Sequence, residues 1–164
     1  MRRVIFHVDV NSAFLSWEAC YRLHHLGAKQ DLRKLVSAVG GDQEKRHGII
    51  LAKSIPAKKY HIQTGETVVS AKEKCPDTDK IEQYSIDEAF LDMTGCCDDP
   101  ERTAYEIKHR IHTELGFTVN IGISENKLLA KMASDFEKPD KVHTLFPEEI
   151  QVKMWPLPIG ELYM

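Results

Sequence analysis

The chain has 164 residues, 42% of them hydrophobic and 29% charged, and its formal net charge is -3. This size and composition predict one or two globular domains with a real core and argue against disorder for most of the chain. No apolar stretch reaches membrane-spanning length, and the run after the basic start at 1–3 is too short for a signal peptide, so we expect a cytoplasmic protein. Nucleic-acid binding depends largely on basic surface. Because the net charge is negative, we expect most contacts with any nucleic acid to be made by other regions of the protein.

The four cysteines and eight histidines show no pattern typical of a zinc site or a disulfide framework. There is no C-x-x-C pair, and the adjacent Cys96 and Cys97 are poorly placed to ligate one ion, so reduced thiols are expected. His109 and His112 would share one side of a helix, where solvated surface positions explain them better than metal ligation. The histidines are therefore assigned no role.

The first predicted element is a buried strand over residues 4–10, which ends with Asp9 next to its last residue. The polar pair at 11–12 can cap a helix that runs through Phe14 and stops at Gly27. This strand-to-helix order places Asp9 and Phe14 near one another.

A small separate sheet is predicted from two short apolar runs. Residues 36–41 and 48–52 read as the strands of a hairpin across a charged turn at 42–47. Short helices are expected to follow at 56–61 and 67–74, the first with proline near its start.

Two adjacent acids, Asp87 and Glu88, lie between two strands predicted within residues 81–93. Neighbouring side chains of a regular strand point to opposite faces, so these two share a pocket only if the chain turns or bulges there. We therefore predict a tight hairpin bend at the two acids.

The last predicted elements are a helix over 101–115, an alternating strand over 117–123, and a second helix that starts after Ser124 and ends before Pro139. The second helix turns apolar side chains toward the core. A different face of it carries three charged residues, Lys127, Lys131 and Asp135.

This order of elements predicts an α+β fold, a split ferredoxin-like sheet with its helices on one face. Asp9 and Asp87 would lie on adjacent central strands, with Glu88 beside them. Carboxylates about 4 Å apart repel by roughly 4 kcal/mol at an effective dielectric near 20, so gathering them requires a cation or bound protons. Mg2+-assisted phosphoryl transfer is the chemistry that most often needs such a group.

Four blocks of sequence, at residues 7–14, 50–60, 84–92 and 119–135, follow the pattern of one enzyme family. The most specific are Ser85-Ile86-Asp87-Glu88-Ala89 and Gly122-Ile123-Ser124-Glu125-Asn126-Lys127. Together they resemble the Y-family translesion DNA polymerases of the bacterial DNA polymerase IV type. The resemblance implies template-directed DNA synthesis across damaged DNA, with nucleotide transferred from a dNTP to a primer 3'-hydroxyl.

The resemblance also implies a domain organisation. A ferredoxin-like palm would comprise residues 1–10 and 78–139, inserted fingers would comprise residues 11–77, and residues 140–164 would lead into a truncated thumb. The thumb and little finger would be absent, and in the family they carry most duplex contacts and the tail that binds the sliding clamp. The implied partners are primer-template DNA, dNTP and, through the absent regions, the clamp; no membrane is involved.

By the same resemblance, Asp9, Asp87 and Glu88, with the carbonyl of Val10, would hold two Mg2+ ions about 4 Å apart. One ion would activate the primer 3'-hydroxyl, and the other would neutralise the incoming triphosphate. Taken singly, Asp9 is explained as a helix cap and Asp87 as a turn former. Taken together with their spacing, the acids favour the metal site.

Further roles follow from matching positions. Phe14 would be the steric gate whose ring fills the space of a ribose 2'-hydroxyl, although an aromatic on an amphipathic helix is usually core. Lys127 would contact the triphosphate, and Lys58 stands where relatives often have arginine, so it offers a point charge instead of a planar fork. Ala52 and Ile55 stand where relatives often place Thr and Tyr, so side-chain hydrogen bonds to phosphate are missing there.

One departure from the family is internal. Between Asp77 and Ile81 the family normally inserts a strand and a long palm helix, whereas only three residues, Thr78-Asp79-Lys80, stand here. The segment either was deleted or is missing from this sequence. Deletion would expose apolar palm surface, which favours the second explanation.

Two other functions remain open. A palm-type nucleotidyl cyclase shares the split sheet and a Gly-Gly-Asp motif, and residues 40–42 supply those letters, but Gln43-Glu44 does not complete it. A non-catalytic relic that binds nucleotide or DNA is the other alternative. Retention of all three acids and Lys127 argues against it.

Overall fold

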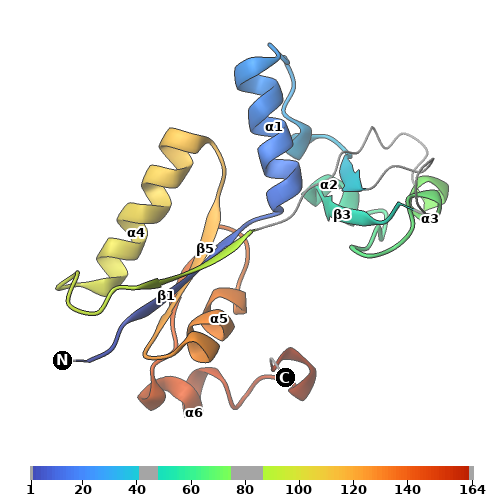
Figure 1. Ribbon diagram of the computed structural model, residues 1–164. Helices are drawn as coiled ribbons and strands as arrows, with labels where there is room; N and C mark the ends of the chain where they lie inside the picture. Colours follow the sequence, from blue (N-terminus) through green and yellow to red (C-terminus); the bar gives the residue numbers. More distant parts are fainter. Residues whose placement is uncertain (1, 41–47, 75–86, 163–164) are drawn as a thin grey trace. The chain divides into compact units, whose positions relative to one another are not determined.

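The structure is a computed structural model that describes residues 2–40, 48–74 and 87–162. The chain divides into two units, whose residues can be followed in Figure 1 by the colours of the sequence. We call Met1–Asn11 with Asp87–Met164 the sheet unit and Ser12–Ile86 the insertion unit. The assignment of these parts to palm, fingers and thumb lead remains a prediction.

The sheet unit holds the larger set of elements. In chain order they are β1 Ile5–Val10, β4 Glu88–Asp92, α4 Pro100–Arg110, the π-helical turn η2 Ile111–Leu115, β5 Val119–Ser124, α5 Lys127–Asp135, β6 Val142–Thr144, the 3-10 turn η3 Pro147–Glu149, α6 Ile150–Lys153 and the 3-10 turn η4 Ile159–Glu161. The strands predicted over 4–10 and 117–123 and both predicted helices are therefore present, and the α+β class is confirmed.

The four described strands of the sheet unit follow the order β4-β1-β5-β6. β1 runs antiparallel to both of its neighbours, while β6 runs parallel to β5. In this register Asp9 is opposite Glu88 on one side and opposite Asn120 on the other. β1, which carries Asp9, is therefore a central strand, as predicted. β4 is the edge strand of the described sheet, so β1 and β4 are not both central.

The two long helices cover opposite faces of this sheet, as Figure 1 shows for α4 and α5. Ile121 and Ile123 of β5 pack in one cluster with Ala104 of α4. Gly122, between them, faces α5, because a Cβ built on it would run into the backbone of that helix. Alternate residues of a strand point to opposite faces, so the expectation that the helices share one face is wrong.

The bend predicted at Asp87 and Glu88 is also wrong for the part that the structure describes. Glu88 is the first residue of the regular strand β4, and the amide of Val10 donates to the carbonyl of Asp87 at 2.9 Å. The ladder between β1 and β4 thus continues without a bulge through both acids. The strand predicted to start at Ile81 lies outside the described residues.

The insertion unit contains α1 Ala13–His25, the 3-10 turn η1 Leu32–Lys34, β2 Ala38–Gly40, β3 Ile50–Lys53, α2 Ile55–Lys58 and α3 Val68–Lys74. β2 and β3 pair antiparallel, which confirms the predicted small sheet; its turn at 42–47 lies outside the described residues. Ser12 has a left-handed backbone, with φ 47°, and its side chain makes no capping bond. In the described part of the chain, every helix is too short or too polar to cross a bilayer.

Candidate functional site

Two of the three predicted acids face each other across neighbouring strands of the sheet unit. Asp9 of β1 and Glu88 of β4 are direct cross-strand partners, so both side chains stand on the face of the sheet that α5 covers. Asp9 is buried, with 7% of its surface exposed, whereas the Glu88 side chain is 44% exposed. Asp87 precedes β4 and is half-buried.

Each of the two facing acids is held by a lysine. The ammonium of Lys138 donates to Oδ2 of Asp9, and that of Lys131 donates to Oε2 of Glu88. Lys138 also pairs with Oδ1 of Asp135 at 2.7 Å. Lys131 and Asp135 belong to α5, and Lys138 follows shortly after it, so one helix and its exit supply the positive charge at the acids.

The electrostatics at Asp9 favour a bound cation. Burial raises the pKa of Asp9 above its ordinary value, the hydrogen bond from Lys138 opposes this, and the charges of Glu88 and Asp87 raise it further. The pKa of Glu88 is lowered, chiefly by its hydrogen bond from Lys131. Burial disfavours the charge of Lys138, but the hydrogen bonds that its ammonium donates to Asp135 and Asp9 leave its pKa raised.

His7 is a third group at the acids, and the sequence analysis gave it no role. Its ring is 1% exposed, with Nδ1 2.7 Å from Oγ of Ser134 and Nε2 3.4 Å from Oε2 of Glu88. Burial lowers the pKa of His7, while the charge of Glu88 acts in the opposite direction. The signal that could have found it is its position two residues before Asp9, on the same face of the strand.

Lys127 stands at the first position of α5, exposed to solvent, directly after the capping residue Asn126. Its ammonium lies 5.4 Å from the ring centre of Phe90 in β4, within reach of a cation–π interaction. Phe90 in turn contacts His7, with ring centres 4.6 Å apart. The structure thus brings Lys127 to the strand that carries Glu88.

The donor set at the acids fits Mg2+ in chemistry, since carboxylate oxygens are its preferred protein ligands. Glu88 and Asp87 are close enough to Asp9 to raise its pKa, so the three acids form a local excess of negative charge that a divalent ion would relieve. No three His, Cys, Asp or Glu side chains among the described residues are already arranged as a metal cage. The fit therefore rests on donor type and charge, with lysines engaging two of the acids.

The other two predicted site residues belong to the insertion unit. Phe14 of α1 is half-buried and packs in a cluster with Leu15, Val39 and Ala52, with its ring 6.1 Å from that of Trp17. Lys58 is the last residue of α2 and is exposed. Their roles toward sugar and phosphate stay predictions, as does that of the Val10 carbonyl.

Two substitutions relative to the family pattern also have a place in the insertion unit. Ala52 is buried in β3, where its methyl group packs against apolar neighbours. Ile55, at the start of α2, is 61% exposed. Neither side chain can donate a hydrogen bond, and the loss of phosphate contacts at these positions stays a prediction.

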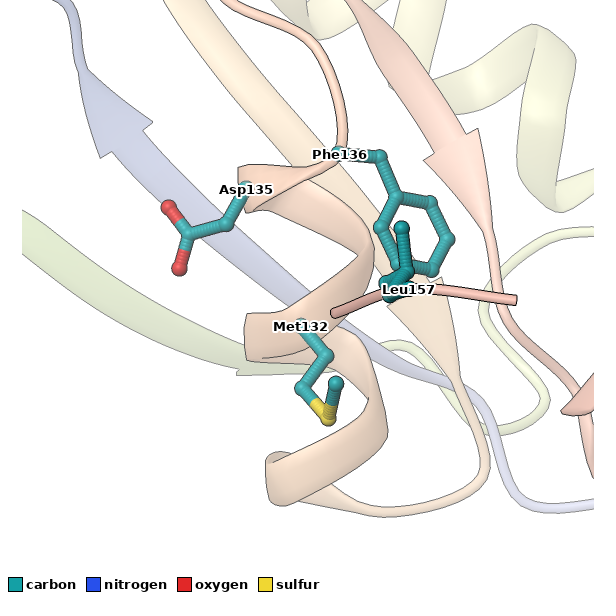
Figure 2. Close-up of a pocket in the computed structure, with 4 residues that line it drawn as sticks. All are labelled: Met132, Asp135, Phe136 and Leu157. Atoms are coloured by element: carbon teal, nitrogen blue, oxygen red, sulfur yellow. The ribbon is translucent and has the colours of Figure 1, made fainter. Parts of the chain in front are cut away.

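A pocket of about 280 Å3 lies beside α5, lined by Met132, Asp135, Phe136 and Leu157. Figure 2 shows the Asp135 carboxylate turned away from Phe136 and Leu157. That carboxylate is the one engaged by Lys138. Three of its four lining residues are apolar, and neither Asp9 nor Glu88 lines it.

Comparison with known proteins adds to this geometry. A model of the impB/mucB/samB family matches residues 8–78 and 77–135, most of the chain. The chain belongs to this family. The two matched stretches meet at residues 77–78, where the sequence analysis placed the missing strand and helix.

The chain is similar to several bacterial DNA polymerases IV. It is 51% identical to the enzyme of Clostridium acetobutylicum over 191 positions, which cover 100% of the chain and 48% of that relative. It is 38% identical to that of Acetivibrio thermocellus, covering 99% of the chain and 46% of the relative. The chain thus spans about half the length of these curated relatives, and the first alignment has 27 more positions than the chain has residues.

Solved structures show the same fold. The insertion ternary complex of Dbh DNA polymerase matches with a TM-score of 0.76 at 24% identity, covering 97% of this chain and 53% of that one. DinB from Sulfolobus solfataricus matches with a TM-score of 0.76 at 20% identity over the same shares. At this level of identity the likeness concerns the fold alone.

Proposed function

We propose that this chain is the catalytic part of a translesion DNA polymerase, which transfers a nucleotide from a dNTP to a primer 3'-hydroxyl on a template. The observation that carries the proposal is the cross-strand pair of Asp9 and Glu88, beside Asp87, in a member of the impB/mucB/samB family. Its relatives named DNA polymerase IV support the same activity. A cytoplasmic location and an interaction with the sliding clamp through other regions remain predictions.

The site residues of the sheet unit would have two roles, metal binding and phosphate binding. Asp9, Glu88 and Asp87, with the carbonyl of Val10, would hold two Mg2+ ions. Bound there, the ions supply a lowered pKa for the attacking hydroxyl and neutralisation of the triphosphate. Lys127 presents an exposed positive charge at the start of α5, where the first backbone N–H groups also favour anions. It is suited to hold a phosphate group of the dNTP.

The insertion unit would select the sugar of the incoming nucleotide and add a phosphate contact. We propose Phe14 as the steric gate against ribonucleotides and Lys58 as a second phosphate contact. In a complete enzyme, Phe14→Ala is expected to increase ribonucleotide incorporation relative to deoxyribonucleotide incorporation. The ratio is measured with matched rNTP and dNTP on one primer-template, and an unchanged ratio would remove the assignment.

Mg2+-dependent primer extension tests the proposed activity. The chain alone is expected to bind dNTP and Mg2+ weakly and to extend a primer without processivity, because its net charge of -3 gives little attraction for DNA. Asp9→Asn and Glu88→Gln should abolish any templated addition, whereas Glu101→Gln, at an exposed acid on α4, should not change it. Robust processive extension by these 164 residues would contradict the expectation for the chain alone.

The same reaction mixtures discriminate the alternatives. Cyclic nucleotide formed from NTP without primer would support the cyclase, and absence of any product in the complete protein would support a non-catalytic relic. Family membership gives the cyclase no support. In the Gly-Gly-Asp sequence at 40–42, Gly40 is the last residue of β2, and Gly41 and Asp42 lie outside the described residues.

A further inference from the structure

Lys138 differs from an ordinary surface lysine because its backbone is anchored on both sides. The buried amide of Asn120 donates to the carbonyl of Glu137 at 2.6 Å and accepts from the amide of Lys141 at 3.2 Å. Asn11, itself bonded to Asn120, accepts from the amide of Asp140 at 2.9 Å. These bonds fix the segment on either side of Lys138 beside the end of β1.

The ammonium of Lys138 bridges two carboxylates of different kinds. One is Asp9, buried and a proposed metal ligand; the other is Asp135, whose side chain is 42% exposed and which no proposed catalytic step uses. A divalent ion bound at Oδ2 of Asp9 would lie next to the ammonium that engages that oxygen, and repulsion between the two positive charges favours moving the ammonium away. Asp135 remains as a partner, so the displaced lysine keeps one ion pair.

We infer that Lys138 is a displaceable counter-ion of Asp9 and that Asp135 is the holding partner onto which it moves when a divalent cation binds. The pair thereby sets the metal affinity of the site. At Glu88 the ammonium comes from Lys131, and His7 is the neighbouring group. This inference rests on the proposed function, since it assumes that Asp9 is a metal ligand.

Three variants give effects of different sign. Lys138→Met removes the competing charge and keeps most of the apolar stem, so it should tighten binding of Mn2+, the probe ion, by about tenfold, given the partial solvent exposure. Asp135→Asn removes the holding partner, so it should weaken binding by about threefold. In the Lys138→Met background Asp135→Asn should have little further effect, because it acts through the lysine.

The experiment follows free Mn2+ by electron paramagnetic resonance during titration of the purified chain. Lys141→Met is the matched control, because it removes the same charge three residues away, where the side chain pairs with the exposed Glu137 at 3.3 Å. It should leave the affinity within about twofold of the wild type. Lys138→Arg keeps the charge and should bind as the wild type does, and circular dichroism verifies the fold of each variant.

A second readout does not depend on substitution. Acetylation of lysines, followed by mass spectrometry with and without Mn2+, should show faster labelling of Lys138 in the presence of the ion and unchanged labelling of Lys141. Wild-type or weaker Mn2+ affinity in Lys138→Met would overturn the inference, as would Lys138 labelling that ignores the ion.

Failure of the inference and failure of the proposed function are distinguishable through Asp9→Asn. If Asp9→Asn abolishes Mn2+ binding while Lys138→Met leaves it unchanged, the metal site stands and the counter-ion role falls. If Asp9→Asn binds Mn2+ as the wild type does, Asp9 is no metal ligand, and both the metal site of the proposed function and the inference fall.

Discussion

Gly122 lies in the centre of β5, at the point where the strand passes closest to α5. A Cβ at this position would overlap the carbonyl oxygen of Ala130 and the amide nitrogen of Ser134, and would lie 3.0 Å from Cβ of Ala133. Two of these three atoms are helix backbone, which cannot rotate away as a flexible side chain could. Any side chain at residue 122 therefore pushes the helix that carries Lys127 and Lys131 away from the strand.

We predict that Gly122→Ala lowers the free energy of unfolding by about 3 kcal/mol, the upper end of overpacking costs. Urea unfolding followed by circular dichroism measures it. Gly160→Ala is the matched control, since a Cβ there meets nothing within 4 Å, and it should change stability by less than about 0.5 kcal/mol. Equal stabilities of the two variants would contradict the close approach of strand and helix.

Asn120 is the second residue whose substitution should have a large effect on stability. Its side-chain amide is fully buried, and it both donates and accepts hydrogen bonds. It donates to the carbonyls of Ser134 and Glu137 and accepts from Asn11 and Lys141. Asn120→Leu would leave these groups without their partner at a cost of about 3 kcal/mol. Asn126→Leu is the control, because it removes only the exposed cap of α5, and it should cost about 1 kcal/mol in the same urea experiment. If the loss of stability at residue 120 is smaller than the loss at residue 126, water replaces the amide of Asn120.

At the scale of elements, Arg2 joins three segments of the sheet unit that are far apart in sequence. Its Nε donates to Glu125, just before α5, at 2.5 Å, and its two terminal nitrogens donate to the carboxylate of Glu148 in η3 at 2.7 Å each. The guanidinium also stacks 4.0 Å from the ring centre of Phe146. This bidentate geometry is the one in which an exposed ion pair contributes most.

The ion pair gives a pH dependence with a definite sign. The hydrogen bond from Arg2 lowers the pKa of Glu148 from 4.5 to about 2. A carboxyl whose folded pKa is depressed contributes stability that is complete above the unfolded value, near pH 4.5, and is lost as the pH falls toward 2. Because Glu148 is exposed, solvent screening keeps this contribution small.

We therefore expect Glu148→Gln to lower the melting temperature by a small amount, on the order of 1–3 °C, at pH 5–7. The difference from the wild type should shrink below pH 4.5 and vanish near pH 2. In an Arg2→Gln background the Glu148 substitution should have no pH-dependent effect. A difference that persists unchanged at pH 2.5 would show that the carboxylate charge does not contribute.

The elements themselves were largely predictable, because their signals are local. The apolar run at 4–10, the periodicity over 101–115 and the apolar pattern after Ser124 each identify an element from neighbouring residues. The faces were also readable: β5 alternates large apolar residues with Asn120 and Gly122, which favours a helix on each side. The expectation of one helical face came from the order of the elements and did not use this alternation.

The site was less predictable, because it depends on register. The hairpin bend was predicted in order to bring Asp87 and Glu88 to one pocket, whereas the structure pairs Glu88 with Asp9 across the strands. The partner of Asp9, Lys138, is 129 residues away, and no local pattern signals that contact. Lys131 could have been suspected, since it lies one turn after Lys127 on the same face of the predicted helix.

At the scale of the molecule, the break in the family match at residues 77–78 precedes the exposed strand β4. All residues of β4 are exposed, including Phe90 at 39% and Leu91 at 36%. The preceding residues 77–78 are where the two family matches meet, and the relative from Clostridium acetobutylicum has 27 additional aligned positions. Phe90 and Leu91 are thus exposed apolar residues that a strand and helix inserted before β4 would be expected to cover.

Restoring those positions from the relative between Asp77 and Thr78 should raise the melting temperature and reduce binding of a dye specific for apolar surface. Scrambling the inserted sequence, with its composition kept, is the control and should do neither. If the scrambled and the natural insertions behave alike, β4 is not the surface that the segment covers.

The connection between the units makes a second prediction at this scale. The insertion unit leaves the sheet unit after Asn11 and returns at Asp87, and these two points lie on neighbouring strands: the amide of Val10 donates to the carbonyl of Asp87 at 2.9 Å. Hairpins of this kind close with about two to five residues. Replacing Ser12–Ile86 by four residues rich in Gly and Asn should therefore leave a sheet unit that unfolds cooperatively and still binds Mn2+ through Asp9 and Glu88. The same excision in a Gly122→Ala background should be markedly less stable, which separates a folded product from a collapsed one. A non-cooperative product from the wild-type excision would mean that the sheet unit depends on the insertion for its fold.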